Sequence, residues 1–247
     1  MDLSGAAVLV AGGAGQIGRA LVTALLERGT RVAVTDHLDQ AQTIFAGRDI
    51  LYHPGDAADE ADCVRVVRKS VETLGSIDAL INCAGMIHNE PLINLLKTDD
   101  RRHRLSSWDA VIRANLTSTF VLGSVVAEQM AATRTPGVIV NLSSVASAGN
   151  PGQSAYSAAK AGVEALTAAW AKELGLLGIR VVAVAPGFID IASTHAALGE
   201  SVIKEWIRKT PLRRLGSADA VIAAIMFAIE NDFLTGRTIQ VDGGVVL

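Results

Sequence analysis

Short apolar runs alternate with longer segments of helical periodicity along the whole chain, and this alternation constrains the fold more than any other feature. The runs are continuous stretches of Val, Ile, Ala and Leu, not alternations of apolar and polar residues. Strands buried on both faces have such sequences, so the pattern predicts a parallel sheet covered by helices on each side. The predicted strands lie within residues 6–11, 31–36, 49–56, 77–85, 137–144, 179–187 and 238–244.

The segments between these strands predict the helices. They lie at residues 17–29, 58–75, 108–132, 156–175 and 219–230. Because strands and helices alternate from one end of the chain to the other, we predict a single doubly wound α/β domain of the Rossmann type over residues 1–247, with about seven parallel strands. Ligands bind beyond the carboxyl ends of the strands in such a sheet, which is where the glycine-rich and polar segments of this chain fall.

Composition argues against several classes of function. The net charge of −3 gives no electrostatic reason to expect a nucleic acid or an anionic membrane as partner. Cys63 and Cys83 lack the spacing of a zinc site or a redox pair, and the five histidines are scattered, so no metal site is predicted. The first residues contain neither a basic n-region nor a long apolar run. Together with the free thiols, this indicates a cytoplasmic protein.

A glycine-rich turn follows the first predicted strand. The segment AGGAGQIG, residues 11–18, lies between that strand and the first helix. Glycines permit a tight turn and a close approach of the backbone to a pyrophosphate, which the N–H groups of the following helix then face. The strand–turn–helix context favours a dinucleotide-binding turn over an ordinary connection between a strand and a helix.

An acidic residue, Asp36, ends the second predicted strand. A carboxylate at this place accepts hydrogen bonds from a ribose 2′-OH and repels a 2′-phosphate. The following residue, His37, is not an arginine that would bind such a phosphate. We therefore expect NAD in preference to NADP. The alternative is a surface aspartate that caps the next helix.

A tyrosine and a lysine lie four residues apart in the segment SAYSAAKAG. Side chains at this spacing share one face of a helix. A tyrosine titrates near pH ~10, too high for a general base at neutral pH, and a nearby ammonium group favours the phenolate. We therefore expect Lys160 to lower the pKa of Tyr156 and make it a proton carrier. The alternative is a tyrosine at a helix start and a solvated lysine.

Together these segments resemble the short-chain dehydrogenase/reductase family, in its shorter, single-domain branch. The resemblance covers the whole chain, because the motifs occur in the order that the family shows. They are AGGAGQIG (11–18), Asp36, GDAAD (55–59), NCAG (82–85), RANLTSTF around Asn115, NLSS (141–144), YSAAK (156–160), APGFID (185–190) and TGRTIQVDGG (235–244).

The resemblance implies a role for each matching residue. Tyr156 is the expected general acid/base, Ser144 the residue bonded to the reacting oxygen, and Asn115 the holder of a water in the proton relay. Lys160 completes the catalytic set and holds the nicotinamide ribose. The cofactor is expected to contact Gly12, Gly15, Gln16, Ile17, Gly18, Asp36, Asp56, Ala57, Asn82, Ala84, Gly85, Tyr156, Lys160, Pro186, Gly187 and Ile189. The implied reaction is hydride transfer between NAD(H) and the carbinol or carbonyl carbon of a secondary alcohol or ketone.

The sequence departs from the family pattern near the expected cofactor. Gln16 stands where this branch usually has Gly, and Ala11 where it has Thr. Ile191 stands where a Thr often bonds the nicotinamide amide, a role that Thr194 would take over. The segment at 94–107 is a few residues longer than usual, so the loop before the Asn115 helix is expected to be reshaped.

The position of the catalytic serine leaves two candidates. The gap from Ser144 to Tyr156 is one residue shorter than usual in the family, and by this gap Ser143 fits. By distance from Asn141 at the strand end, Ser144 fits. We favour Ser144, because a strand end fixes geometry better than a loop does.

The sequence says less about the substrate and about the assembly of subunits. The substrate loop is expected from Phe188 to about Pro211, with Asn150, Gln153 and His88 near its mouth. The predicted substrate contacts are Ser144, Gln153, Tyr156 and Phe188. The helices at 108–132 and 156–175 are apolar over wide arcs, which suggests subunit contacts, although thick internal burial is the alternative. The resemblance implies a homotetramer.

Three functions follow from this sequence. The first is an NAD-dependent alcohol or hydroxyacyl dehydrogenase that works mainly in oxidation. The second is an NADPH-dependent reductase of the 3-ketoacyl-carrier-protein type, against which Asp36 argues. The third is a non-catalytic regulator that senses dinucleotides. The complete catalytic set argues against the regulator, since such a protein needs only the glycine turn.

Overall fold

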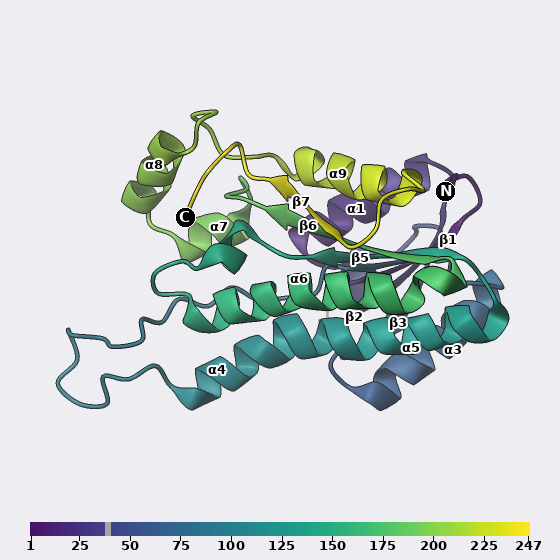
Figure 1. The fold of residues 1–247 in the computed structure, drawn as a ribbon, viewed down its shortest axis with the longest axis horizontal. Helices are drawn as coiled ribbons and strands as arrows, with labels where there is room; N and C mark the ends of the chain where they lie inside the picture. The colour runs from purple at the N-terminus through teal and green to yellow at the C-terminus, as the bar shows by residue number, and fades with distance from the viewer. Residues whose placement is uncertain (38–40) are drawn as a thin grey trace.

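A computed structural model of the chain describes residues 1–37 and 41–247 (Figure 1). These residues form a seven-stranded parallel sheet in the order β3-β2-β1-β4-β5-β6-β7, which confirms the predicted fold class. The strands are β1 Ala7–Ala11, β2 Arg31–Asp36, β3 Ile50–Pro54, β4 Ala79–Asn82, β5 Gly137–Leu142, β6 Ile179–Pro186 and β7 Arg237–Val241. Each lies within or overlaps a strand that the sequence predicts.

Helices cover both faces of the sheet. The α-helices are α1 Gln16–Glu27, α2 Ala41–Ile44, α3 Glu60–Leu74, α4 Leu105–Ile112, α5 Ser118–Thr133, α6 Ser154–Leu174, α7 Ala192–Ala197, α8 Glu200–Lys209 and α9 Ala218–Glu230. A π-helical turn, η1 Arg113–Thr117, joins α4 to α5, and two short 3₁₀ helices are η2 Val145–Ala148 and η3 Gly175–Leu177. Figure 1 shows α1 and α9 above the sheet, and α3, α4–α5 and α6 below it.

The strands carry apolar side chains toward both helical layers. In β1, Val8 and Val10 belong to the core cluster that includes residues of α1 and α9, whereas Leu9 belongs to the cluster that includes residues of α3, α5 and α6. This division follows from the two-residue period of a strand, which sends successive side chains to opposite faces. The continuous apolar runs in the sequence therefore supply apolar side chains to the cores on both faces of the sheet.

Local signals in the sequence set the ends of α3. The Asp59 side chain caps the first turn by accepting a hydrogen bond from the Asp62 N–H at 2.9 Å. The helix ends before Gly75, whose φ of +84° lies in the region that favours glycine. The predicted segment 58–75 thus matches the observed helix to within two residues at each end.

The structure differs from the sequence prediction in two places. The expected substrate loop contains two helices, α7 and α8, whose short lengths give little periodic signal. The expected helix at 108–132 begins at Leu105 and is interrupted by the π-helical turn η1. The sequence does not reveal this turn, because its one extra residue leaves the apolar periodicity nearly unchanged.

One helix of the described residues, 105–133, is long and apolar enough to cross a membrane. Its second half, α5, contacts α3 and α6 and packs against β4 and β5. Leu122, Val126 and Met130 are fully or almost fully buried there. The helix is therefore a partly buried core helix.

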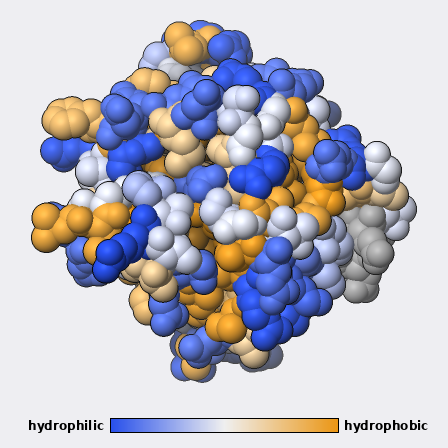
Figure 2. Space-filling model, turned by 90° about the vertical axis from the view of Figure 1, so that its right-hand side faces the viewer, coloured by the Kyte–Doolittle hydropathy of each residue, from blue (hydrophilic) through white to orange (hydrophobic). Residues whose placement is uncertain are grey.

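The outer surface is mixed in character. Figure 2 views the molecule from the right-hand side of Figure 1, where hydrophobic residues form a band among hydrophilic ones. Single large apolar side chains such as Leu176 and Phe233 are almost completely exposed. Single exposed apolar residues of this kind occur on most folded chains.

Replacement of a central core residue tests the two-layer packing. Leu80→Ala in β4, where the side chain is completely buried, should lower the free energy of unfolding by about 2–5 kcal/mol because it leaves a cavity. The matched replacement Leu176→Ala, at a fully exposed position, should change it by less than about 0.5 kcal/mol. Denaturant unfolding followed by circular dichroism measures both. Equal effects of the two replacements would contradict this packing.

Candidate active site

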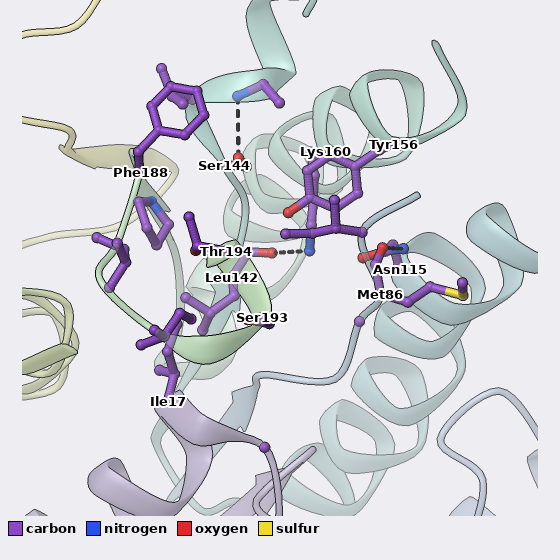
Figure 3. Close-up of a pocket in the computed structure, with 18 of the residues that line it drawn as sticks. Ile17, Met86, Asn115, Leu142, Ser144, Tyr156, Lys160, Phe188, Ser193 and Thr194 are labelled. Carbon is purple, nitrogen blue, oxygen red and sulfur yellow. Dashed lines mark hydrogen bonds between the residues drawn. The ribbon is translucent and has the colours of Figure 1, made fainter. Parts of the chain in front are cut away.

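The candidate site lies at the carboxyl ends of the strands. There β1 pairs with both β2 and β4, so the chain leaves the sheet in opposite directions on either side of β1. A crevice forms at such a switch point. A cavity of about 650 Å³ lies here, a size typical of small-molecule sites. Figure 3 shows its lining, which comes from the glycine turn, the ends of β4, β5 and β6, and helices α6 and α7.

Close packing requires glycine in the turn after β1. A Cβ added to Gly12, whose φ is +71°, would lie 2.6 Å from the backbone of Ala84. A Cβ at Gly18 would lie 2.3 Å from the Gly12 carbonyl oxygen. Neither position admits a side chain without movement of the backbone. The turn is therefore held against β4, with the start of α1 facing the cavity.

Asp36 ties the glycine turn to the end of β2. Its Oδ2 accepts a hydrogen bond from the Ala14 N–H at 2.9 Å, and its Oδ1 lies 3.7 Å from Nδ1 of His37. The side chain is almost completely buried. The carboxylate thus lies beside the turn, as the sequence predicts, and also orders the turn itself.

Tyr156 and Lys160 lie one turn apart on α6, and both side chains are buried. The Lys160 Nζ donates a hydrogen bond to the Leu142 carbonyl at 2.8 Å and lies 5.6 Å from the centre of the Tyr156 ring. Figure 3 shows both side chains directed into the cavity. The alternative of a solvated lysine is therefore wrong.

Burial dominates the titration of both groups. It raises the pKa of Tyr156, and a hydrogen bond with the Ser144 side chain acts in the opposite direction. Burial lowers the pKa of Lys160 to about 8, with an opposing effect of the Cys83 thiol. Lys160 is not among the causes of the shift in Tyr156, and its amine binds the Leu142 carbonyl, so its effect on the pKa of the phenol stays a prediction.

The two candidate serines have different surroundings. Ser143 is buried, and its Oγ donates to the Lys160 carbonyl at 3.2 Å and to the Glu164 Oε1 at 2.8 Å. Ser144 caps η2, where its Oγ accepts the Ala146 N–H at 3.2 Å, and its side chain is near enough to the Tyr156 phenol to oppose the rise of the phenol's pKa. Ser144 therefore has its hydroxyl beside the phenol, whereas the Ser143 hydroxyl is directed to α6.

Asn115 lies in the π-helical turn and is completely buried. Its Nδ2 donates to the carbonyls of Met86 and Val111, each at 2.9 Å. Its Oδ1 is buried and has no hydrogen-bond partner among the described residues. A Cβ at Gly85 would lie 2.5 Å from this oxygen and 3.5 Å from the Lys160 Nζ, so the space there depends on glycine. Because this buried oxygen has no hydrogen-bond donor, it is suited to accept a hydrogen bond from a molecule in the cavity, such as water.

The cavity brings together most, but not all, of the predicted residues. Those that line it are Gly12, Gly15, Gln16, Ile17, Gly18, Gly85, Asn115, Ser144, Asn150, Gln153, Tyr156, Lys160, Pro186, Gly187, Phe188, Ile189 and Thr194. The other predicted cofactor residues, Asp36, Asp56, Ala57, Asn82 and Ala84, are not part of its lining.

The predicted residues outside the lining have structural contacts. Asp56 accepts hydrogen bonds from the Ala58 N–H at 2.8 Å and from Arg113 Nη2 at 2.7 Å. The Asn82 Nδ2 donates to the Asn141 Oδ1 at 2.9 Å, which joins β4 to β5. Asn82 thus stabilises the sheet.

Two residues expected at the substrate mouth are bound to neighbouring side chains. His88 is not part of the cavity lining, and its Nε2 lies 3.0 Å from the Glu90 Oε2. Gln153 lines the cavity, but its Oε1 accepts from Asn150 at 2.9 Å and its Nε2 donates to the Asn89 Oδ1 at 2.7 Å. The side-chain amides of Gln153 and Asn150 are thus bonded to each other in the wall of the cavity.

Sequence reasoning missed several lining residues, including Met86, Ile87, Val145 and Leu198. They lie in loops or short helices, where no periodicity marks them. It also missed that Phe188 stacks on Trp206 of α8, with ring centres 4.3 Å apart. The chain makes an extended excursion before α4 (Figure 1), whereas the reshaping of the loop at 94–107 relative to the family stays a prediction.

These features fit a nicotinamide dinucleotide. The turn after β1 lacks side chains where a pyrophosphate would approach, and the buried polar groups Asn115, Tyr156 and Lys160 lie at the far side of the same cavity. No group of three or more potential metal ligands occurs among the described residues. Fold and site thus define an α/β dinucleotide-binding oxidoreductase.

Comparison with known proteins identifies the family. A protein-family model described as enoyl-(acyl carrier protein) reductase matches residues 12–246. The 3-oxoacyl-(acyl-carrier-protein) reductase FabG of Thermotoga maritima is 36% identical over 256 residues, with 100% of both chains covered. The acetoacetyl-CoA reductase of Allochromatium vinosum is 34% identical, with 97% of this chain and 98% of that protein covered. The chain belongs to the short-chain dehydrogenase/reductase family and is an oxidoreductase that acts on CH–OH or C=O groups.

Replacing each serine in turn tests the assignment of Ser144. Ser144→Ala should lower kcat by about 10²–10³, because it removes the hydroxyl beside the phenol. Ser143→Ala should mainly lower the free energy of unfolding, by about 1 kcal/mol, because it removes a buried bond to α6. Steady-state kinetics and denaturant unfolding distinguish them. A larger loss of kcat for Ser143→Ala would assign the role to that residue instead.

Proposed function

We propose that the protein is an NAD(H)-dependent enzyme that interconverts a secondary alcohol and a ketone, with Tyr156 as general acid/base. The observation that carries this proposal is the pair of hydroxyls, of Tyr156 and Ser144, in a cavity that begins at the glycine turn. A regulator that only binds a dinucleotide has no need of this pair. The whole chain, residues 1–247, would act as one catalytic domain.

The protein's own groups would manage the oxygen and its proton. When bound, the nicotinamide ring donates or accepts the hydride. Ser144 would donate a hydrogen bond to the carbonyl oxygen, and Tyr156 would deliver a proton to that oxygen during reduction or take it during oxidation. Lys160 would hold the nicotinamide ribose, and a water on the Asn115 Oδ1 would connect Lys160 to solvent.

The protonation of Tyr156 favours one direction at neutral pH. Its pKa in the folded protein lies above the ordinary value of 10.0, so the phenol is protonated below that pH. A protonated phenol is ready to act as the acid in carbonyl reduction, whereas oxidation requires the phenolate. This supports reduction at neutral pH, in contrast to the oxidation expected from the sequence.

The lining of the cavity favours an uncharged carbonyl substrate. Lys160 is the one charged side chain among the described lining residues, and its amine already binds the Leu142 carbonyl. Met86, Ile87, Val145 and Phe188 contribute apolar surface. A substrate carboxylate would find no free cation in this lining. We therefore propose a ketone whose neighbouring groups are apolar or neutral.

A second candidate is reduction of a 3-oxoacyl thioester. Relatives over nearly the full chain are a 3-oxoacyl-(acyl-carrier-protein) reductase and an acetoacetyl-CoA reductase. The reacting portion of such a substrate is neutral, so the same apolar cavity accepts it. The carrier to which the thioester is attached would remain outside the cavity. Comparing a simple ketone with an acetoacetyl thioester in a rate assay distinguishes the two candidates.

Asp36 supports NAD as the cofactor. Its buried carboxylate lies at the end of β2 beside the glycine turn, where a 2′-phosphate would meet a negative charge. The alternative of a surface aspartate does not agree with its burial. The homotetramer and the cytoplasmic location stay predictions. Exposed apolar residues such as Phe120 and Phe227 are consistent with subunit contacts.

Removal of the phenol hydroxyl tests the proposed chemistry. Tyr156→Phe should lower kcat by about 10²–10⁴, because it removes the proton donor, while NADH still binds with similar affinity. Ketone reduction followed by NADH absorbance and NADH binding followed by fluorescence measure the two effects. Retained turnover in this variant would exclude Tyr156 as the acid/base.

The pH dependence of the wild-type enzyme gives a second test. Because the phenol must lose its proton for oxidation, kcat/KM for alcohol oxidation should rise about tenfold per pH unit through the neutral range. For ketone reduction it should stay level there, since the phenol remains protonated. The measurement is kcat/KM for both directions over a range of pH at constant ionic strength. A plateau for oxidation at neutral pH would mean that the pKa of Tyr156 is lowered, not raised.

A change of charge without a change of shape tests the role of Asp36. Asp36→Asn keeps an oxygen that can accept the Ala14 N–H but removes the negative charge. The ratio of kcat/KM for NAD over NADP should therefore fall, by about tenfold or more, with little change in thermal stability. If the wild-type enzyme prefers NADP, or if this ratio is unchanged in the variant, Asp36 does not select the cofactor.

A further inference from the structure

One hydrogen bond joins the glycine turn to the segment that follows β6. The Gln16 Oε1 accepts the Ser193 N–H at 3.0 Å, across 177 positions of the sequence. Gln16 is the first residue of α1, and Ser193 lies in the first turn of α7. Both residues line the cavity, and Figure 3 labels Ser193 there. The bond therefore connects two parts of the wall that are far apart in the sequence.

Helix α7 has few other ties to the rest of the molecule. It has six residues, and the side chains of Ala192, Ser193, His195 and Ala196 are exposed. Within the described part of the chain, the bond to Gln16 is the single hydrogen bond from α7 to residues outside 188–216. An isolated helix of this length is unstable in water, so its position depends on such contacts.

The segments on either side of α7 are held more firmly. Before it, backbone hydrogen bonds join Phe188 and Asp190 to Gly216 at 2.9 and 2.8 Å. After it, Trp206 of α8 stacks on Phe188. Helix α7 thus spans two anchored points, and both the buried Thr194 and the Ser193 that binds Gln16 line the cavity.

We propose that Gln16 is a latch that holds α7 closed against the glycine turn and so slows the release of a bound dinucleotide. The latch depends on a side chain that a glycine at this position would lack. Gln16 is a positioning residue in this proposal, because it acts through α7. The proposal rests on the proposed function for the identity of the ligand, but the closure of α7 is a property of the protein alone.

The first experiment measures closure without any nucleotide. Trypsin cleaves after Lys204, Arg208 and Lys209 in α8, which begins at Glu200, directly after the end of α7 at Ala197. Cleavage there therefore reports an opening in which α7 leaves the glycine turn and α8 leaves Phe188 together with it. Gln16→Met keeps the length of the side chain and removes the acceptor. Loss of one hydrogen bond should raise the open population, and with it the initial cleavage rate in α8, by about 2- to 10-fold. Mass spectrometry of the fragments assigns the cut.

Two variants serve as controls. Gln16→Glu retains an oxygen acceptor at the same reach and should be cleaved at close to the wild-type rate. Gln240→Met makes the same chemical change at an exposed position of β7, away from the cavity, and should also behave like wild type. Equal thermal midpoints for all four proteins exclude a general loss of stability as the cause of faster cleavage.

The second experiment measures release of the ligand. NADH is bound to each protein and displaced by excess NAD in a stopped-flow instrument, with NADH fluorescence as the signal. The dissociation rate of Gln16→Met should exceed that of wild type by the same factor as its cleavage rate. The Gln240→Met rate should be unchanged.

Each other result overturns the latch. Unchanged cleavage of Gln16→Met means that Gln16 does not hold α7, even where NADH leaves faster through loss of a direct contact. Faster cleavage of both Gln16→Met and Gln16→Glu means that the acceptor oxygen is not the cause. Faster cleavage with unchanged NADH release refutes the effect on the ligand. If wild type binds no NADH, the proposed function fails, and with it the effect on release, while the trypsin result still decides whether Gln16 holds α7.

Discussion

The close contact between the glycine turn and β4 is the constraint on which the site depends. Gly12 and Gly18 have no room for a Cβ, because the backbones of Ala84 and of the turn itself occupy that space. The contact fixes the start of α1 beside the crevice that opens where β1 pairs with both β2 and β4. Asp36 reinforces it by accepting the Ala14 N–H. A dinucleotide site therefore exists here as a consequence of how tightly the sheet and its first turn pack.

Burial then decides the chemistry of the polar groups. Tyr156 and Lys160 lie on one face of α6, as their spacing requires, but their surroundings remove water from both. Desolvation keeps the phenol protonated and weakens the charge of the amine, whose pKa falls to about 8. Ser144 opposes this effect on the phenol through a hydrogen bond. Burial thus sets the protonation state of the pair, on which its proposed role in proton transfer depends.

Sequence reasoning succeeded where a residue's role follows from regular structure. The strands, the long helices, the glycine turn and the Tyr156–Lys160 face follow from periodicities of two and 3.6 residues and from the order of strands and helices. It failed at α7, at the π-helical turn around Asn115, and at His88, which pairs with Glu90 outside the cavity. Short helices and loops give no periodic signal, and their contacts come from residues distant in the sequence.

The sequence alone was enough to predict the doubly wound sheet, the place of the site at the carboxyl ends of the strands, and the residue types that meet there. These properties follow from local chain geometry and from the apolar pattern, which act between near neighbours. The folded structure was needed to show which serine lies near the phenol, which way the pKa of Tyr156 moves, and that Gln16 accepts a hydrogen bond from Ser193. Each of these depends on distances and desolvation between segments far apart in the chain, which no local pattern encodes.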